Sequence, residues 1–224
     1  MSSAGTPPRW GALFDWDGVL VDSKALHQAA WDQVAREFGY RHGPDDFRRH
    51  FGSQNRRAIS EILRWTSDRA IIERISTRKE IIYRERLGAT DIWMPGSIDF
   101  VERLVASSVP CAVVSSSPRE NIDVVLARGG QRSLFRAIVT AEDTRASKPD
   151  PEGFRLGASR LQLPPERCVV FEDAPAGIQA GLAGGMRVVA LSTTHDASEL
   201  GAAHLLAPAL GGELLAELER WFQN

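Results

Sequence analysis

The stretch Leu13-Phe14-Asp15-Trp16-Asp17-Gly18-Val19 places two carboxylates, one residue apart, at the end of a short apolar run. Such a run predicts a buried strand, where a charged side chain costs stability unless it has a partner. Because side chains alternate along a strand, Asp15 and Asp17 can share one side while Trp16 points into packing. Two close carboxylates repel each other, so the pair indicates a divalent metal or a dyad that shares a proton. The structural alternative is a polar turn.

Further apolar runs rich in β-branched residues recur along the chain, at 112–114, 137–139, 169–171 and 188–191. Each run predicts a buried parallel strand, and the amphipathic stretches 119–127, 152–161 and 176–182 between them predict helices. This alternation is typical of a doubly wound, Rossmann-like α/β sheet.

The long interval between the first strand and the run at 112–114 has a helical pattern instead. We expect helices near 24–38, 56–65 and 68–87, with turns at Gly39, Gly43-Pro44, Gly52 and Gly88. The sequence therefore predicts an inserted helical cap over residues 24–92, and a core domain built from 1–23 and 93–224. The insertion would lie above the carboxyl end of the first strand, where open α/β sheets bind ligands.

Two later strand ends and one loop supply the other groups that phosphoryl transfer needs. Ser115-Ser116-Ser117 ends the second strand in hydroxyls that can hold phosphate oxygens, and Glu172-Asp173 ends another strand with oxygen ligands for Mg²⁺. Both segments could instead be ordinary helix N-caps. Lys148 lies in the stiff loop Ser147-Lys148-Pro149-Asp150-Pro151 and offers a fixed cation, although an exposed loop lysine is the alternative.

These segments, DWDGV, VVSSS, SKPDP and VFEDAPAGIQA, resemble in this order the four motifs of the haloacid dehalogenase-like superfamily. The resemblance covers nearly the whole chain. It is strongest to the branch of phosphatases and β-phosphoglucomutases, which carries a helical cap between the first and second motifs.

The resemblance implies a role for each motif residue. Asp15 would attack phosphorus and form an aspartyl-phosphate, and Asp17 would act as general acid and base. Ser115 and Lys148 would bind the phosphoryl group. The implied cofactor is Mg²⁺, and its implied ligands are Asp15, the backbone carbonyl of Asp17, and Asp173, with Glu172 at the edge. Because Asp17 must begin protonated, we expect its neighbours to raise its pKa.

Substrate contacts beyond the phosphoryl group should come from the cap and from Ser116. His27 matches a cap histidine found near the leaving oxygen in relatives, and Lys79 resembles a cap lysine of the mutases. Both could equally be packing or surface residues. Where the mutases have an arginine that grips a distal phosphate, this chain has Asn55, although Arg56 could reach the same place.

The function that these features favour is hydrolysis of a small sugar or polyol phosphomonoester. A hexose-phosphate mutase is the first alternative. A phosphonatase would need a cap lysine, for which Lys24 is the candidate, and an inactive binding module conflicts with the complete motif set. Dehalogenases need neither Asp17 nor Mg²⁺.

Composition agrees with a small-molecule enzyme. The 224 residues carry a net charge of −2, which offers no basic surface for nucleic acid or an anionic membrane. Cys111 and Cys168 lie beside apolar runs and predict buried free thiols. Without a signal peptide or membrane span in the sequence, we expect a cytoplasmic protein that is a monomer or a weak dimer and binds a small phosphorylated metabolite.

Overall fold

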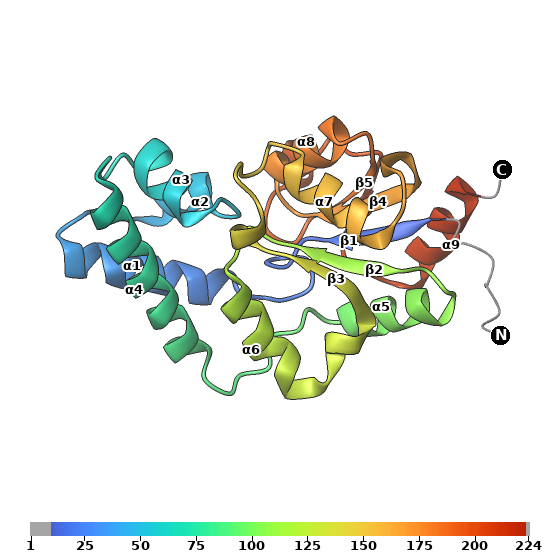
Figure 1. The fold of residues 1–224 in the computed structure, drawn as a ribbon, viewed down its shortest axis with the longest axis horizontal. Coiled ribbons are helices and arrows are strands. Elements are labelled where there is room, and N and C mark those ends of the chain that lie inside the picture. The colour runs from blue at the N-terminus through green and yellow to red at the C-terminus, as the bar shows by residue number, and fades with distance from the viewer. Residues whose placement is uncertain (1–9, 223–224) are drawn as a thin grey trace.

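A six-stranded parallel sheet forms the centre of the computed structural model, which describes residues 10–222. The strands lie in the order β3-β2-β1-β4-β5-β6 (Figure 1). Their bounds are β1 Gly11–Phe14, β2 Cys111–Val114, β3 Phe135–Val139, β4 Cys168–Glu172, β5 Arg187–Leu191 and β6 Leu205–Ala207. The predicted fold class, a doubly wound α/β protein, is confirmed.

The central strand β1 pairs with β2 on one side and with β4 on the other. The chain first builds outward from β1 to β3 and then crosses back to β4, so the strand order reverses between β1 and β4. Open α/β sheets bind ligands at such a reversal, outside the carboxyl ends of the strands. Asp15 directly follows β1, and Glu172 ends β4. Both acidic motifs therefore reach the same point of the sheet.

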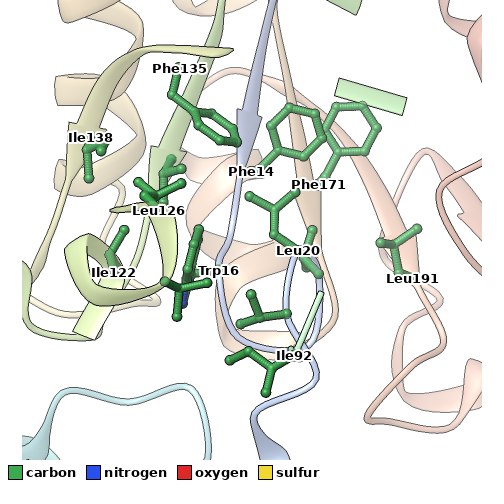
Figure 2. Packing of buried hydrophobic residues seen from close by; sticks show 14 of the residues in the cluster. Phe14, Trp16, Leu20, Ile92, Ile122, Leu126, Phe135, Ile138, Phe171 and Leu191 are labelled. Carbon is green, nitrogen blue, oxygen red and sulfur yellow. The ribbon is translucent and has the colours of Figure 1, made fainter. Parts of the chain in front are cut away.

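Successive side chains of a strand point to opposite faces of the sheet, and here both sets are mostly apolar, so helices cover both faces. Phe14 and Phe171 stack at 4.5 Å on one face (Figure 2). Phe100 contacts both rings edge-on. Leu13 belongs to the opposite layer, together with Phe154. The first face is covered by α5 Ser97–Ala106, α6 Arg119–Gly129 and α9 Gly212–Trp221, and the second by α7 Glu152–Leu161 and α8 Pro175–Ala183.

Between β1 and α5 the chain forms a group of helices at one end of the sheet (Figure 1). These helices lie within residues 24–92, which we call the cap. Its long helices α1 Lys24–Phe38 and α4 Arg69–Leu87 pack against each other. The shorter α2 Pro44–His50, α3 Asn55–Arg57 and a π-helical turn Ala58–Ile62 lie between them. The segments that enter and leave the cap meet at a bridge between Val21 and Trp93.

Parts of the secondary structure differ from the prediction. The helix expected over 56–65 is α3 followed by the π-helical turn, which ends at Ile62. Gly43-Pro44, expected as a turn, begins α2, because proline is tolerated in the first turn and the Asp46 carboxylate accepts a hydrogen bond from the Gly43 N–H at 3.1 Å. The elements α5, α9 and the short strand β6 had no predicted counterpart. Four 3₁₀ turns complete the described chain, at Gln131–Leu134, Ala141–Asp143, Pro165–Arg167 and Ala197–Glu199.

Both cysteines are buried and unpaired, as predicted. Burial raises the pKa of Cys111, and of Cys168, to about 12. None of the helices within residues 10–222 has the length and apolar character that crossing a membrane requires.

Candidate active site

Asp15 sits at the centre of the carboxyl edge of the sheet, one residue beyond β1. Its backbone N–H donates to the carbonyl of Phe171 in β4, which continues the pairing of the two strands past their ends. The residue is only 5% exposed. A carboxylate at this depth requires partners, and the neighbouring strand ends supply them.

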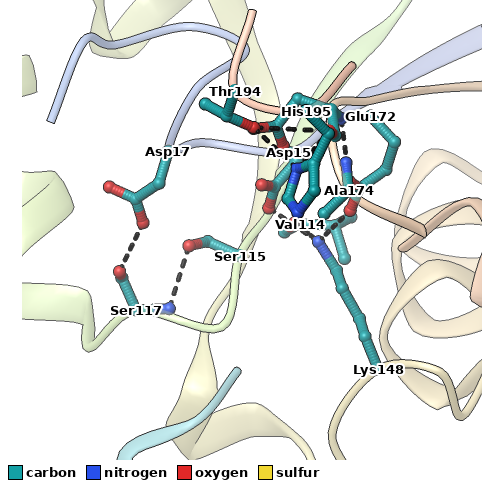
Figure 3. Close-up of polar contacts among 11 residues, drawn as sticks. Asp15, Asp17, Val114, Ser115, Ser117, Lys148, Glu172, Ala174, Thr194 and His195 are labelled. Carbon is teal, nitrogen blue, oxygen red and sulfur yellow. Dashed lines mark hydrogen bonds and ion pairs between the residues drawn. The ribbon is translucent and has the colours of Figure 1, made fainter. Parts of the chain in front are cut away.

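Lys148 is the cationic partner of this site (Figure 3). Its Nζ donates to Oδ1 of Asp15 and to Oε1 of Glu172, each at 2.6 Å. It also lies 4.9 Å from the centre of the Phe154 ring. Burial alone would lower the pKa of Lys148, but the two carboxylates outweigh it and raise the pKa, so the ammonium stays charged. The loop lysine is thus buried at the site instead of lying in solvent.

Three carboxylates converge beside this lysine. Asp15, Glu172 and Asp173 each offer an oxygen, and these oxygens lie within 4.8 Å of one another. Burial, together with the charges of Glu172 and Asp17, raises the pKa of Asp15 to about 7 although Lys148 opposes the shift. The pKa of Asp173 is also raised, by burial first and then by Glu172 and Asp15. Three carboxylates that repel one another can be held together by a divalent cation. Hard cations prefer oxygen ligands, so the residues present fit Mg²⁺.

Among these three carboxylates, that of Glu172 accepts the most hydrogen bonds. Its Oε1 accepts from Lys148, and its Oε2 accepts the backbone N–H groups of Asp173 and Ala174 at 3.0 and 3.1 Å. Asp15 and Asp173 therefore have more free oxygen valence than Glu172. Glu172 therefore holds Lys148 and the residues that lead into α8, at the edge of the group of three carboxylates.

Gly18 and Thr194 shape the opposite side of the acidic group. Gly18 has a φ of 83°, and a Cβ there would overlap the Asp173 carboxylate and lie 2.7 Å from Cγ2 of Thr194. The Thr194 hydroxyl donates to Oδ2 of Asp173. Thr194 was missed by the sequence analysis, because it lies after β5 outside the recognised motifs.

The serines after β2 form the third wall. Ser115 is buried, and its Oγ accepts the backbone N–H of Ser117 at 2.9 Å. Ser116 lines the cavity between this loop and the cap. Ser117, expected from the sequence among the hydroxyls that could hold phosphate oxygens, donates from its hydroxyl to Oδ2 of Asp17 at 2.6 Å.

Asp17 turns toward Ser117 and the cap (Figure 3). Its Oδ1 accepts from Ser23 Oγ at 2.5 Å and from His27 Nε2 at 3.0 Å. The raised pKa expected for Asp17 is wrong in this arrangement: burial raises it, but His27 and the hydroxyls of Ser117 and Ser23 outweigh burial and lower it well below its ordinary value. These donors could not be weighed from the sequence, because Ser117 lies 100 positions from Asp17 and His27 lies on a separate helix.

His27 connects Asp17 to a buried pair on α4. Lys79 Nζ lies 2.9 Å from His27 Nδ1 and 2.9 Å from Glu80 Oε1. An ammonium can only donate, so His27 Nδ1 accepts and its Nε2 carries the proton shared with Asp17. The His27 ring also stacks on Tyr83 at 4.1 Å. The structure therefore brings His27 and Lys79 to the site together.

Arg56 lies apart from this group. Its side chain is exposed and does not line the cavity beside Asp17. The next residue, Arg57, donates to the backbone carbonyl of Lys148, and Asn55 donates to Oε1 of Glu80 at 2.7 Å. Glu80 and its core partner Asn121 were not singled out from the sequence, because nothing local marks a contact between two helices.

Fold and site together define a class: a doubly wound hydrolase whose carboxylates and lysine meet at the strand-order reversal, beneath a helical insertion. The model of the haloacid dehalogenase-like hydrolase family matches residues 12–191, and the chain belongs to this family. The predicted superfamily is confirmed.

Curated relatives define the activity class. The chain is 38% identical to the chloroplastic 5-amino-6-(5-phospho-D-ribitylamino)uracil phosphatase of Arabidopsis thaliana, over 94% of this chain and 57% of that protein. It is 34% identical to hexitol phosphatase A of Escherichia coli, over 89% of this chain and 91% of the relative. The predicted enzyme class, a phosphoric monoester hydrolase, is confirmed.

The fold also matches a solved mutase. The structure of β-phosphoglucomutase from Clostridium difficile superposes with a TM-score of 0.84 at 23% identity, covering 94% of this chain and 96% of that one. At this identity the likeness supports the fold alone.

Proposed function

We propose that the chain is a Mg²⁺-dependent phosphatase that hydrolyses a small sugar or polyol monophosphate through an aspartyl-phosphate on Asp15. The contact of Lys148 with Asp15, beside the carboxylate of Asp173, carries this proposal. A buried nucleophile with a fixed cation and a metal-binding group beside it is what attack on an anionic phosphate requires. The named substrates of the relatives, a ribityl phosphate and hexitol phosphates, support a polyol or sugar as the leaving alcohol.

In the first step an oxygen of Asp15 attacks phosphorus and the bond to the leaving oxygen breaks. Lys148 offsets the negative charge of nucleophile and phosphoryl group, and the Ser115 hydroxyl holds a phosphoryl oxygen. Asp15, Asp173 and the backbone carbonyl of Asp17 would hold Mg²⁺, which would supply further positive charge to the phosphoryl oxygens.

Asp17 handles the proton in both steps. For the first step it must carry a proton, which it can take up from solvent once the substrate displaces donors that lower its pKa, because burial then raises that pKa. It gives this proton to the leaving alcohol and then takes one from the water that attacks the aspartyl-phosphate, which frees phosphate and restores Asp15. In the closed arrangement its carboxylate is occupied by Ser23, His27 and Ser117. The substrate must therefore displace some of these contacts before Asp17 can reach the leaving oxygen.

The cap must move to admit the substrate. The cavity between Asp17, the 115–117 loop and the cap has a volume of about 30 Å³, far below the roughly 300 Å³ of the smallest ligand sites. We propose that residues 24–92 act as a cap domain that hinges near the bridge between Val21 and Trp93. Closure then shields the phosphoryl group from bulk water.

A hexose-phosphate mutase is the second candidate, favoured by the buried contact of His27 with Lys79. Phosphate release from a panel of sugar and polyol phosphates, with and without Mg²⁺, separates the two candidates if phosphoryl migration between sugar positions is followed in parallel. Metal-dependent release supports the phosphatase, and migration with little release supports the mutase. The buried free thiols support a cytoplasmic enzyme, and we propose that it works as a monomer or weak dimer.

A further inference from the structure

The cavity beside Asp17 lies where the leaving group must be, because Asp17 is the proposed proton donor to that group. It is lined by residues of α1, α2, α4, the 51–55 segment and the 115–117 loop. Its lining decides which chemical groups the leaving alcohol can carry. The charge of this lining is therefore informative about substrate class.

The residues that line this cavity include one lysine, Lys79, and no arginine. The charge of the Lys79 ammonium is already balanced by a carboxylate. The Nζ lies 2.9 Å from Oε1 of Glu80 and also contacts His27 Nδ1. Lys79 and Glu80 are 3% and 5% exposed, so they form a buried ion pair with little solvent screening. The ammonium is therefore already paired with groups of the protein and is not free to bind an anion of the substrate.

Glu80 is fixed from both sides of the junction between cap and core. Oε1 accepts from Asn55 Nδ2 of the cap at 2.7 Å, and Oε2 accepts from Asn121 Nδ2 of α6 at 2.7 Å. Asn121 is held in turn by Arg84, which donates to its Oδ1 at 2.9 Å. Burial raises the pKa of Glu80, but Lys79, His27 and Asn55 outweigh burial and lower it, so the carboxylate is anionic. It cannot swing away while the cap is closed.

His50, on α2, also lines the cavity and is held neutral. Asp32 Oδ1 lies 2.6 Å from His42 Nδ1, so His42 donates there and leaves its Nε2 as an acceptor for the Nε2–H of His50 at 2.9 Å. Burial and the neighbouring His42 and Lys79 lower the pKa of His50 to about 3. His50 therefore adds no positive charge to the cavity.

We propose that Glu80 is a specificity-determining residue that admits an uncharged, hydroxyl-bearing leaving group and excludes a second phosphate. This rests on the proposed phosphatase function. Asn55 and the Glu80 carboxylate can accept hydrogen bonds from hydroxyl groups, whereas a dianionic phosphate brought beside Glu80 meets a like charge without a free cation. The substrate class is thus the monophosphates of sugars and polyols, not their bisphosphates.

The test compares fructose 1-phosphate with fructose 1,6-bisphosphate, using the Mg²⁺-loaded wild-type enzyme, Glu80→Gln and Glu85→Gln. Glu85 is an exposed residue of the same helix and serves as the matched control. For the wild type and the control we expect kcat/KM to favour the monophosphate by about 10²-fold or more. In Glu80→Gln the preference should fall by at least about tenfold, mainly through better use of the bisphosphate.

A merely structural role for Glu80 would lower both kcat/KM values together and leave their ratio unchanged, which would overturn the proposal. The wild type decides independently of whether the variant folds: equal use of both substrates also overturns it. An activated aryl phosphate distinguishes failure of the Glu80 role from failure of the proposed phosphatase function. If the wild type hydrolyses the aryl phosphate with Mg²⁺ but does not discriminate between the fructose phosphates, only the role of Glu80 fails. If it hydrolyses none of these esters, the proposed function fails and the role of Glu80 with it.

Discussion

Lys148 Nζ lies 2.6 Å from Oδ1 of Asp15, and the two residues are 133 positions apart in the sequence. The contact joins the end of β1 to the loop before α7, at the point where the strand order reverses. It gives the proposed nucleophile its neutralising cation before any substrate binds.

Replacing Lys148 by Met should destabilise the protein strongly. Asp15 and Glu172 would remain buried without their cation, and breaking a buried pair from one side costs about 3–5 kcal/mol. Chemical denaturation in the absence of metal measures the loss. Adding Glu172→Gln to Lys148→Met should recover part of the lost stability, since one uncompensated charge disappears.

The matched control is Arg49→Met, which breaks an exposed pair with Asp46 and should cost less than about 1 kcal/mol. Equal losses in Lys148→Met and Arg49→Met would contradict the account.

Asp17→Ala should affect substrates according to their leaving group. With a polyol phosphate, whose alkoxide leaves poorly, loss of the general acid should reduce kcat by about 10²–10⁴-fold. With an activated aryl phosphate, which leaves without a proton, the reduction in the first step should be much smaller. Rapid-quench measurement of alcohol release in the first turnover separates this step from later hydrolysis. Equal losses with both esters would rule out the acid role.

Gly18→Ala should disturb the acidic group itself. Gly18 and Gly39 both have positive φ values, 83° and 77°, so an alanine at either position strains the backbone by about 1–2 kcal/mol. A Cβ at Gly39 meets no atom within 4 Å, whereas one at Gly18 would displace the Asp173 carboxylate. Gly39→Ala should therefore keep its Mg²⁺ affinity, and Gly18→Ala should lose affinity in a calorimetric titration. Equal Mg²⁺ affinity in the two variants would show that the Gly18 contact has no part in shaping the site.

The stability of the metal-free protein should depend on pH through Asp15. Its pKa is raised from 3.8 to about 7 on folding, so the folded state binds this proton more tightly than the unfolded state. The resulting stabilisation is present below pH 3.8 and is lost as pH rises through about 7. Thermal unfolding in a chelator should therefore show a steeper loss of Tm across this window for the wild type than for Asp15→Asn. Mg²⁺ should flatten the wild-type slope because the cation favours the charged carboxylates. Identical slopes for the two proteins would contradict the assignment.

The sequence predicted the sheet and the motif residues because these features are local. The apolar runs that became β1, β2, β3, β4 and β5 are each followed by polar residues at the strand end, and a parallel sheet brings those ends to one edge. Asp15 and Asp173 could be placed in this way, whereas Lys148 lies in a loop and was placed through the resemblance of its motif. The short strand β6 was not predicted because its three residues, two half-buried and Leu206 exposed, carry little periodic signal at the edge of the sheet.

Contacts between cap and core could not be predicted in the same way. Glu80 and Asn121 lie 41 positions apart on two helices, and only the docking of α4 against α6 makes them partners. The lowered pKa of Asp17 has a similar origin, because it depends on how His27 and Ser117 are oriented in space. Sequence patterns identify a helix face, but its partner is set by tertiary packing.

The most direct test of the central claim is to locate the phosphoryl group on the protein. Asp17→Asn should slow hydrolysis of the phosphoenzyme while an activated aryl phosphate still phosphorylates Asp15. Acid quenching, proteolysis and mass spectrometry then identify the modified peptide. We predict one added phosphoryl group on Asp15, and none in the double variant Asp15→Asn/Asp17→Asn. A phosphoryl group on another residue, or rapid aryl phosphate turnover by the double variant, would contradict the account.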